Sequence, residues 1–222
     1  MKTLKYEFKD KELIRRALTH RSALNERSLE LEKHNERLEF LGDAVLELII
    51  TEYLFEHYPE RPEGELTSFR AAVVRTESLA ETASKLGFGV HLIMSRGEEA
   101  TGGRERPYIL ANAFEAVLGA MYLDGGYDAC KQFVERELAP KLPDIVEKRL
   151  DIDPKSKLQE LAQEKYKITP TYEVMKEYGP DHDKIFTMQA KLGEKVLAQG
   201  EGKSKQEAEQ AAAAKAFEKI ML

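Results

Sequence analysis

The spacing of apolar residues predicts helices for the first two thirds of this 222-residue chain. Apolar side chains recur there every three to four residues, the period of a helix with one buried face. Residues 95–107 are polar and contain glycines, which indicates a loop. Gly125 and Gly126 are expected to end one helix, and Pro143 another. The predicted helices span residues 9–24, 34–57, 66–87, 108–126 and 127–142.

The pattern changes after residue 146, and residues 147–153 are predicted to be a linker. Beyond them, a short amphipathic helix precedes three segments in which apolar and polar residues alternate, as they do in β-strands. An alanine-rich helix closes the chain. This order predicts an α+β (α-β-β-β-α) domain at residues 154–222, after an all-α domain at residues 1–146.

The helix predicted at 34–57 carries four carboxylates on an otherwise apolar stretch. At about 100° per residue, Glu36, Glu39, Asp43 and Glu47 fall within an arc of about 80°. Ionised carboxylates beside apolar surface are costly unless a basic side chain or a cation compensates them, and Mg²⁺ prefers oxygen ligands. The pattern leaves open the alternative that all four face solvent. The opposite side of the helix carries Leu38, Leu41, Val45, Leu48 and Ile49.

The helix predicted at 108–126 offers a second set of polar side chains. Asn112 and Glu115 lie three residues apart, and therefore on one helical face. Gly119 follows on that face, where a small residue lets another helix approach. Gly42, in the middle of the acidic helix, suggests the same close approach, because such a glycine costs about 1 kcal/mol relative to alanine. The pair could share a cation with the acidic stripe, or it could be an ordinary polar pair at the surface.

Composition narrows the setting in which the chain works. Cys130 is the single cysteine, so no disulfide can form within one chain, and a reducing cytoplasm is expected. No signal peptide and no apolar run of about 18 residues is visible, so no membrane partner is expected. The net charge of −6 argues against a nucleic-acid partner. The acidic excess precedes Asp153, however, and from there on 12 basic and 12 acidic residues balance.

Several motifs resemble, in the same order, those of bacterial ribonuclease III. The most specific is NERLEFLGDAVL at residues 35–46. ALTHRSA precedes it, and EGELT, GGRER and ILANAFEAVLGAMYLDGG follow it. Near the C-terminus, GEGKSKQEAEQAAA resembles the double-stranded-RNA-binding domain of the same family. The resemblance covers essentially the whole chain, and it implies an all-α endonuclease domain followed by an α+β double-stranded-RNA-binding domain.

The resemblance implies a Mg²⁺ site, in which Mn²⁺ can substitute, formed by side chains from two separate segments. The matching metal ligands are Glu39, Asp43, Asn112 and Glu115, of which Asp43 and Glu115 are the catalytic pair. The family usually has an aspartate at the position of Asn112. Because an amide carries no charge, this site is expected to bind Mg²⁺ more weakly.

Further residues match positions around the family's cleavage site. Glu36 and Glu63 match acidic residues near the valley in which RNA is cut, and Phe40 matches an apolar residue that plugs into a partner subunit. Glu47 matches no functional position and is interpreted as structural. The resemblance therefore implies a homodimer that acts on double-stranded RNA.

The implied reaction is hydrolysis of phosphodiester bonds in double-stranded RNA, which leaves 5′-phosphate and 3′-hydroxyl ends. Precursors of ribosomal RNA and structured messenger RNAs are the expected substrates. One alternative is a double-stranded-RNA-binding protein whose cleavage is weakened or absent because of Asn112. The other, which the C-terminal domain disfavours, is a helical metal-dependent hydrolase that acts on a substrate other than RNA.

The C-terminal domain is expected to supply RNA binding by shape, across the minor groove and the phosphates. The start of the closing helix can meet a phosphate, aided by neighbouring lysines. Gln206 stands where the family often has a second lysine, so one phosphate contact is expected to be missing. His182, taken alone, could equally be an ordinary turn residue. The matching RNA-binding residues are Gln159, Gln163, His182, Lys203, Ser204 and Lys205.

Overall fold

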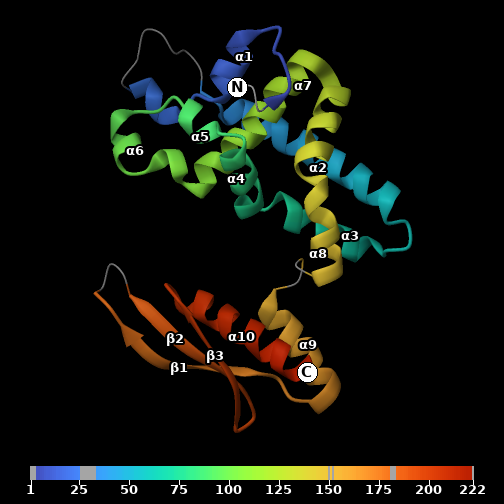
Figure 1. The fold of residues 1–222 in the computed structure, drawn as a ribbon, viewed down its shortest axis with the longest axis vertical. Coiled ribbons are helices and arrows are strands. Elements are labelled where there is room, and N and C mark those ends of the chain that lie inside the picture. Colours follow the sequence, from blue (N-terminus) through green and yellow to red (C-terminus); the bar gives the residue numbers. More distant parts are fainter. Residues whose placement is uncertain (1–3, 26–33, 150, 152, 181–183, 222) are drawn as a thin grey trace. The chain divides into compact units, whose positions relative to one another are not determined.

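The computed structural model describes residues 4–25, 34–149, 151, 153–180 and 184–221 (Figure 1). The chain divides into two compact units, Met1–Asp151 and Ile152–Leu222. In the described residues the first unit consists of helices, and the second combines helices with a three-stranded sheet. The predicted fold class, an all-α domain followed by an α+β domain, is confirmed. None of the helices in these ranges is long and apolar enough to cross a membrane.

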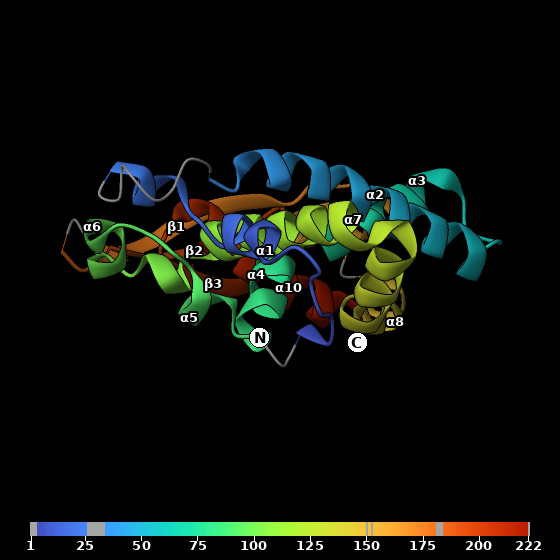
Figure 2. The same cartoon turned by 90° about the horizontal axis from the view of Figure 1, so that it is seen from above.

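Two long helices, α2 and α7, form the centre of the first unit and pack against each other. Figure 2 shows α2 running alongside α7, with α3 beside the far end of α2. Helices α4 and α1 pack on other faces of α7. The helices are α1 (Lys11–Ala17), α2 (Glu36–His57), α3 (Glu63–Val74), α4 (Thr76–Lys85), α5 (Phe88–His91), α6 (Arg96–Ala100), α7 (Pro107–Glu137) and α8 (Leu142–Lys148).

Helix α7 supplies the middle of the hydrophobic core. The ring of Phe114 stacks on Phe88 and Phe133, with ring centroids 6.3 and 5.5 Å away. Between residues 109 and 121 every side chain of α7 is buried except those of Asn112 and Glu115. The two polar residues therefore stand out in a stretch of α7 that is otherwise buried.

Several predicted boundaries of the first unit were wrong. The helix expected at 9–24 ends at Ala17, and a separate 3₁₀ turn follows it. The helix expected at 66–87 is two helices, because Arg75 is extended (φ −60°, ψ 154°) between α3 and α4. One extended residue hardly disturbs the three-to-four spacing of buried residues, so the pattern could not reveal it. Pro143 does not end a helix but lies in the first turn of α8, where its missing N–H needs no partner. The loop expected at 95–107 contains α6 and a 3₁₀ turn at Gly103–Glu105.

The end predicted at Gly125 and Gly126 is present as a kink within α7. Gly126 has φ 77° and ψ −170°, which interrupts the helical backbone there. A positive φ of this size is readily adopted by glycine and strained for other residues. The helix continues past the kink to Glu137, and further short turns lie at Arg21–Asn25 and Ala139–Lys141.

The second unit packs two helices on one face of an antiparallel sheet (Figure 1). The strands lie in the order β1-β2-β3, and Tyr172, Ala190 and Ala198 form one row across them. A Cβ atom on Gly200 would overlap the backbone of α10, so this glycine lets the helix approach the sheet closely. The elements are α9 (Pro154–Tyr166), β1 (Thr171–Tyr178), β2 (Ile185–Leu192), β3 (Lys195–Gly202) and α10 (Lys205–Met221).

Candidate active site

Two glycines bring α2 and α7 into direct backbone contact. A Cβ atom on Gly42 would overlap the carbonyl oxygen of Glu115, and a Cβ atom on Gly119 would overlap that of Leu38. Side chains at both positions are therefore excluded by the opposite helix. Asp43 follows Gly42 on α2, so this crossing places it close to Glu115 on α7.

Electrostatic effects show that the carboxylates from the two helices share one environment. The pKa of Glu115 is raised to about 8, first by burial and then by the charges of Asp43 and Glu39. Burial and the charge of Glu36 also raise the pKa of Glu39, while a hydrogen bond with Asn112 lowers it. Each like charge disfavours ionisation of its neighbour. Side chains from two segments, about 70 residues apart, therefore meet at one place.

The donor set at this place suits a hard cation. Glu39, Asn112 and Glu115 are partly buried, and Asp43 is exposed, so the group opens to solvent. Within the described ranges, no salt bridge involves any of these three carboxylates. Among the described residues, no group of three Asp, Glu, His or Cys side chains is already arranged so that it could hold a metal ion. The site therefore offers a set of oxygen donors whose three carboxyl groups have no basic partner in the part of the chain that the structure describes.

The remaining acids of the predicted stripe have other surroundings. Glu36 lies 3.5 Å from the guanidinium of Arg21 and 3.7 Å from the ring of His34. Glu47 is exposed, and neither Glu39 nor Glu115 has a pKa that responds to it. Glu39 and Asp43 thus form the crowded part of the stripe. Glu36 has basic neighbours, and Glu47 faces solvent.

The outer face of α2 exposes three large apolar side chains. Phe40, Leu48 and Phe55 are 81%, 58% and 74% exposed. Leu48 was grouped with the residues opposite the acids, but it lies in solvent, because α7 covers only the arc centred on Leu38, Val45 and Ile49. A helical pattern gives the direction of a side chain, and the neighbouring helix decides whether that direction is covered.

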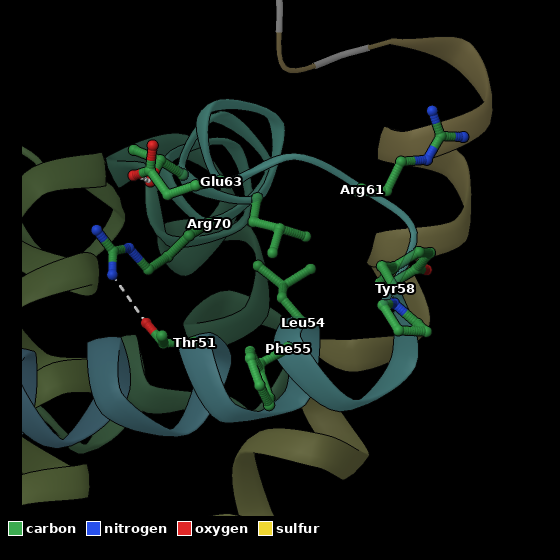
Figure 3. A pocket seen from close by; sticks show the side chains of 10 residues that line it. Thr51, Leu54, Phe55, Tyr58, Arg61, Glu63 and Arg70 are labelled. Carbon is green, nitrogen blue, oxygen red and sulfur yellow. Dashed lines mark hydrogen bonds between the residues drawn. The ribbon is translucent and has the colours of Figure 1, made fainter.

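A pocket of about 570 Å³ lies between α2 and α3, beside Phe55 (Figure 3). Its lining includes Leu54, Tyr58 and Glu63. On its wall, Arg70 donates a hydrogen bond of 2.8 Å to the hydroxyl of Thr51. Glu63 accepts a 2.9 Å hydrogen bond from Thr67, so the structure places it at this pocket rather than with Glu39 and Glu115.

The predicted RNA-binding residues of the second unit lie on two of its elements. Gln159 and Gln163 are exposed one turn apart on α9, and the Gln163 amide donates a 2.6 Å hydrogen bond to Thr169. Ser204 caps α10, because its hydroxyl accepts the Glu207 N–H at 3.1 Å. His182 lies outside the described residues.

The lysines at the start of α10 differ in their surroundings. The backbone N–H of Lys203 donates to Glu207 at 2.9 Å. The ammonium of Lys205 lies 3.2 Å from a carboxylate oxygen of Glu177 on β1. Sequence reasoning missed this contact, since pairing across a sheet brings together residues that no local spacing connects.

Tyr108, beside the predicted metal ligands, also escaped the sequence analysis. It is about half exposed and stands four residues before Asn112, on the same face of α7. The guanidinium of Arg106 donates to its hydroxyl at 3.2 Å and to Glu98 at 2.6 Å. The four-residue spacing from Asn112 was the available signal.

Comparison with known proteins identifies both units. The Ribonuclease-III-like family model matches residues 10–142, and the double-stranded RNA binding motif matches residues 154–220. The chain belongs to the ribonuclease III family. It is therefore an endoribonuclease whose second unit is a double-stranded-RNA-binding domain.

Individual members of the family are similar over nearly the whole chain. Ribonuclease 3 of Desulforamulus reducens is 50% identical over 217 residues, 98% of this chain and 88% of that protein. Ribonuclease 3 of Syntrophobacter fumaroxidans is 48% identical over 221 residues, 98% of this chain and 91% of that protein. The solved nuclease domain of ribonuclease III from Campylobacter jejuni has a TM-score of 0.59 and 44% identity over 64% of this chain and 95% of its own.

Proposed function

We propose that the chain hydrolyses phosphodiester bonds of double-stranded RNA with the help of Mg²⁺, for which Mn²⁺ can substitute, and leaves 5′-phosphate and 3′-hydroxyl ends. The observation that carries this proposal is the crowding of Glu39, Asp43 and Glu115 at the contact of α2 and α7. In the cytoplasm, the substrates would be precursors of ribosomal RNA and structured messenger RNAs.

The oxygen donors of the two helices would hold the cation. Glu39 and Asp43 would contribute from α2, and Asn112 and Glu115 from α7, by rotating their side chains toward a common point. When bound, Mg²⁺ supplies positive charge that activates water and stabilises the phosphate and the leaving oxygen. Asp43 and Glu115 are the proposed catalytic pair, since Asp43 is the exposed member of the group and Glu115 has a pKa raised by burial and by the charges of Asp43 and Glu39.

The chain's own groups must first be prepared for binding. The raised pKa of Glu115 means that it holds a proton near neutral pH and releases it when a cation binds. Asn112 contributes a neutral amide that already contacts Glu39. Asn112 carries no charge, so the site depends on three carboxylates to attract the cation. It therefore needs a higher Mg²⁺ concentration than a site with aspartate at position 112.

A homodimer would place two such sites on one duplex. Phe40 projects from α2, and the pocket of about 570 Å³ opens farther along the same helix. A two-fold axis lets one α2 insert its Phe40 into the other copy's pocket and receive the partner's in return. The similar nuclease domain of ribonuclease III from Campylobacter jejuni has a region involved in dimer formation. Sedimentation of Phe40→Asp tests this arrangement, and a variant that remains dimeric contradicts it.

Glu36, next to the carboxylates of each site, and Glu63, at the pocket farther along α2, are proposed to line the valley that receives RNA. Because the acids repel RNA, affinity must come from the second unit. Its proposed contacts are Gln159 and Gln163 on α9, His182, and the residues Lys203, Ser204 and Lys205 that lead into α10.

The experiment is incubation of the full chain with long duplex RNA, with and without Mg²⁺. Discrete products with 5′-phosphate ends are expected only with the cation, and Asp43→Asn should remove them while duplex binding persists. Asn112 favours one second candidate, a double-stranded-RNA-binding protein with weakened or absent cleavage. That candidate is correct if the wild type binds duplex and leaves it intact at every Mg²⁺ concentration.

A further inference from the structure

Lys205, one of the proposed phosphate contacts, already has an anion beside it. One carboxylate oxygen of Glu177 lies 3.2 Å from the Lys205 ammonium, and the other lies 3.7 Å from the ammonium of Lys184. The Lys205 ammonium also lies 5.6 Å from the ring centroid of Phe186, within the range of a cation–π contact. A phosphate that approaches Lys205 therefore finds a carboxylate already in contact with its ammonium.

The sheet holds this arrangement in place. Glu177 on β1 pairs with Phe186 on β2, and Phe186 pairs with Gly202 on β3. These three residues form one row across the sheet, and Lys205 begins α10 three residues after Gly202. The carboxylate is thus positioned by backbone pairing within the domain.

We propose that Glu177 sets the affinity of the domain for double-stranded RNA by competing with phosphate for Lys205. This inference rests on the proposed RNA-binding role of Lys205. An incoming phosphate must either displace the carboxylate or lie next to it, and both weaken binding. Because the side chains of Lys205 and Glu177 are 56% and 36% exposed, water and salt screen their interaction, and the effect is modest.

The consequence for the enzyme is a lower affinity for any RNA that contacts the domain mainly through the phosphate at Lys205. A duplex that makes several contacts along the domain compensates for the loss at Lys205, whereas a short or single-stranded RNA does not. Glu177 therefore favours extended duplexes and release of short products.

The test is duplex binding by Glu177→Gln, measured as fluorescence anisotropy of a labelled RNA duplex with the full chain in EDTA, over a series of salt concentrations. The substitution is expected to tighten binding about two- to fivefold at low salt, and the gain should shrink as salt screens the charges. A gain that is constant with salt, or weaker binding, overturns the proposal.

Glu173→Gln is the matched control, because Glu173 is on the same strand and loses the same charge. Its carboxylate contacts Lys191 at 3.0 Å and Gln189 at 2.9 Å, away from Lys205. It is expected to change affinity by less than half as much. An equal gain would mean that net charge alone is responsible, and would overturn the proposal.

A double-mutant cycle with Lys205→Gln assigns the effect to one contact. In that background, Glu177→Gln should bring no gain, and a gain that persists contradicts the inference. If Lys205→Gln alone leaves affinity unchanged, this inference fails while double-stranded-RNA binding stands. If the wild type binds no duplex, the proposed function itself fails, and the inference fails with it.

Discussion

Carboxylates in the two units lie in opposite environments. Glu115 in the first unit is partly buried, and burial, Asp43 and Glu39 together raise its pKa to about 8. Glu177 in the second unit is exposed and lies between two lysines. A carboxylate crowded by like charges gains from a divalent cation, whereas one paired with lysine does not need it. The same functional group is thus proposed to take part in the chemistry in one unit and to control RNA binding in the other.

The largest expected effect comes from making the same substitution in both units. Glu115→Gln should lower cleavage of duplex RNA by about a thousandfold or more. It removes a carboxylate that is proposed to hold the cation, and the charge of the cation stabilises the transition state. Glu177→Gln should leave the single-turnover rate at saturating RNA unchanged. Single-turnover cleavage and duplex binding, measured on both variants, check this contrast.

Glu47→Gln is the control within the acidic stripe. Glu47 is on α2 like Glu39, but it is exposed. It should retain cleavage within about twofold. Loss of cleavage in Glu47→Gln would show that the general charge of the stripe matters, and that the group of Glu39, Asp43 and Glu115 is not special.

The next effect tests whether the helix contact creates the crowding. Gly42→Ala places a methyl group on the carbonyl oxygen of Glu115, so the helices must separate. We expect the free energy of unfolding to fall by about 2–3 kcal/mol, and cleavage to fall with it. Gly64→Ala on α3 is the matched control, because a Cβ atom there meets nothing within 4 Å. Chemical denaturation of both variants measures the difference, and equal stabilities would contradict the proposed role of Gly42.

The sequence predicted much of this contact, for reasons that can be named. Gly42 stands among large apolar residues of α2, and Gly119 stands among the small residues Ala116 and Ala120 of α7, so both positions indicated close approach by another helix. Helical spacing put Asn112 and Glu115 on one face. The motifs linked the two segments, which the spacing alone could not do, because no local pattern connects residues about 70 positions apart.

Other features depended on neighbours that the sequence does not reveal. The exposure of Leu48 follows from which arc of α2 is covered by α7. The pairing of Glu177 with Lys205 follows from strand register. The net charge of −6 was a misleading guide to RNA binding. A sum over the whole chain does not show that the crowded carboxylates lie in the first unit and the lysines at the start of α10 in the second.

A smaller effect concerns the pH dependence of stability in the absence of metal. The folded chain keeps the Glu115 proton up to about pH 8, while the unfolded chain loses it near the ordinary value of 4.5. Unfolding therefore releases a proton between these values, so the contribution of Glu115 lowers the free energy of unfolding as pH rises through this window. Discounted for partial exposure, the loss is about 1–3 kcal/mol.

Chemical denaturation in EDTA at pH 5 and at pH 8.5 measures this contribution. Glu115→Gln should lack this contribution. Raising the pH from 5 to 8.5 should therefore lower the free energy of unfolding of the wild type more than that of the variant. Added Mg²⁺ should restore stability to the wild type more than to the variant. Parallel pH profiles for the two proteins would show that Glu115 is not crowded in the folded state.

The smallest expected effect concerns position 112. Asn112→Asp adds a fourth carboxylate to the group of Glu39, Asp43 and Glu115, so the Mg²⁺ concentration that gives half-maximal cleavage should fall about three- to tenfold. The same change should destabilise the metal-free protein, because it adds a like charge to a crowded site. Gln132→Glu, an exposed position beyond the kink of α7, adds the same charge elsewhere and should leave the Mg²⁺ requirement unaltered. A requirement that is equal in wild type and Asn112→Asp would mean that position 112 does not hold the cation, and that the crowding of the other three carboxylates is sufficient for the site.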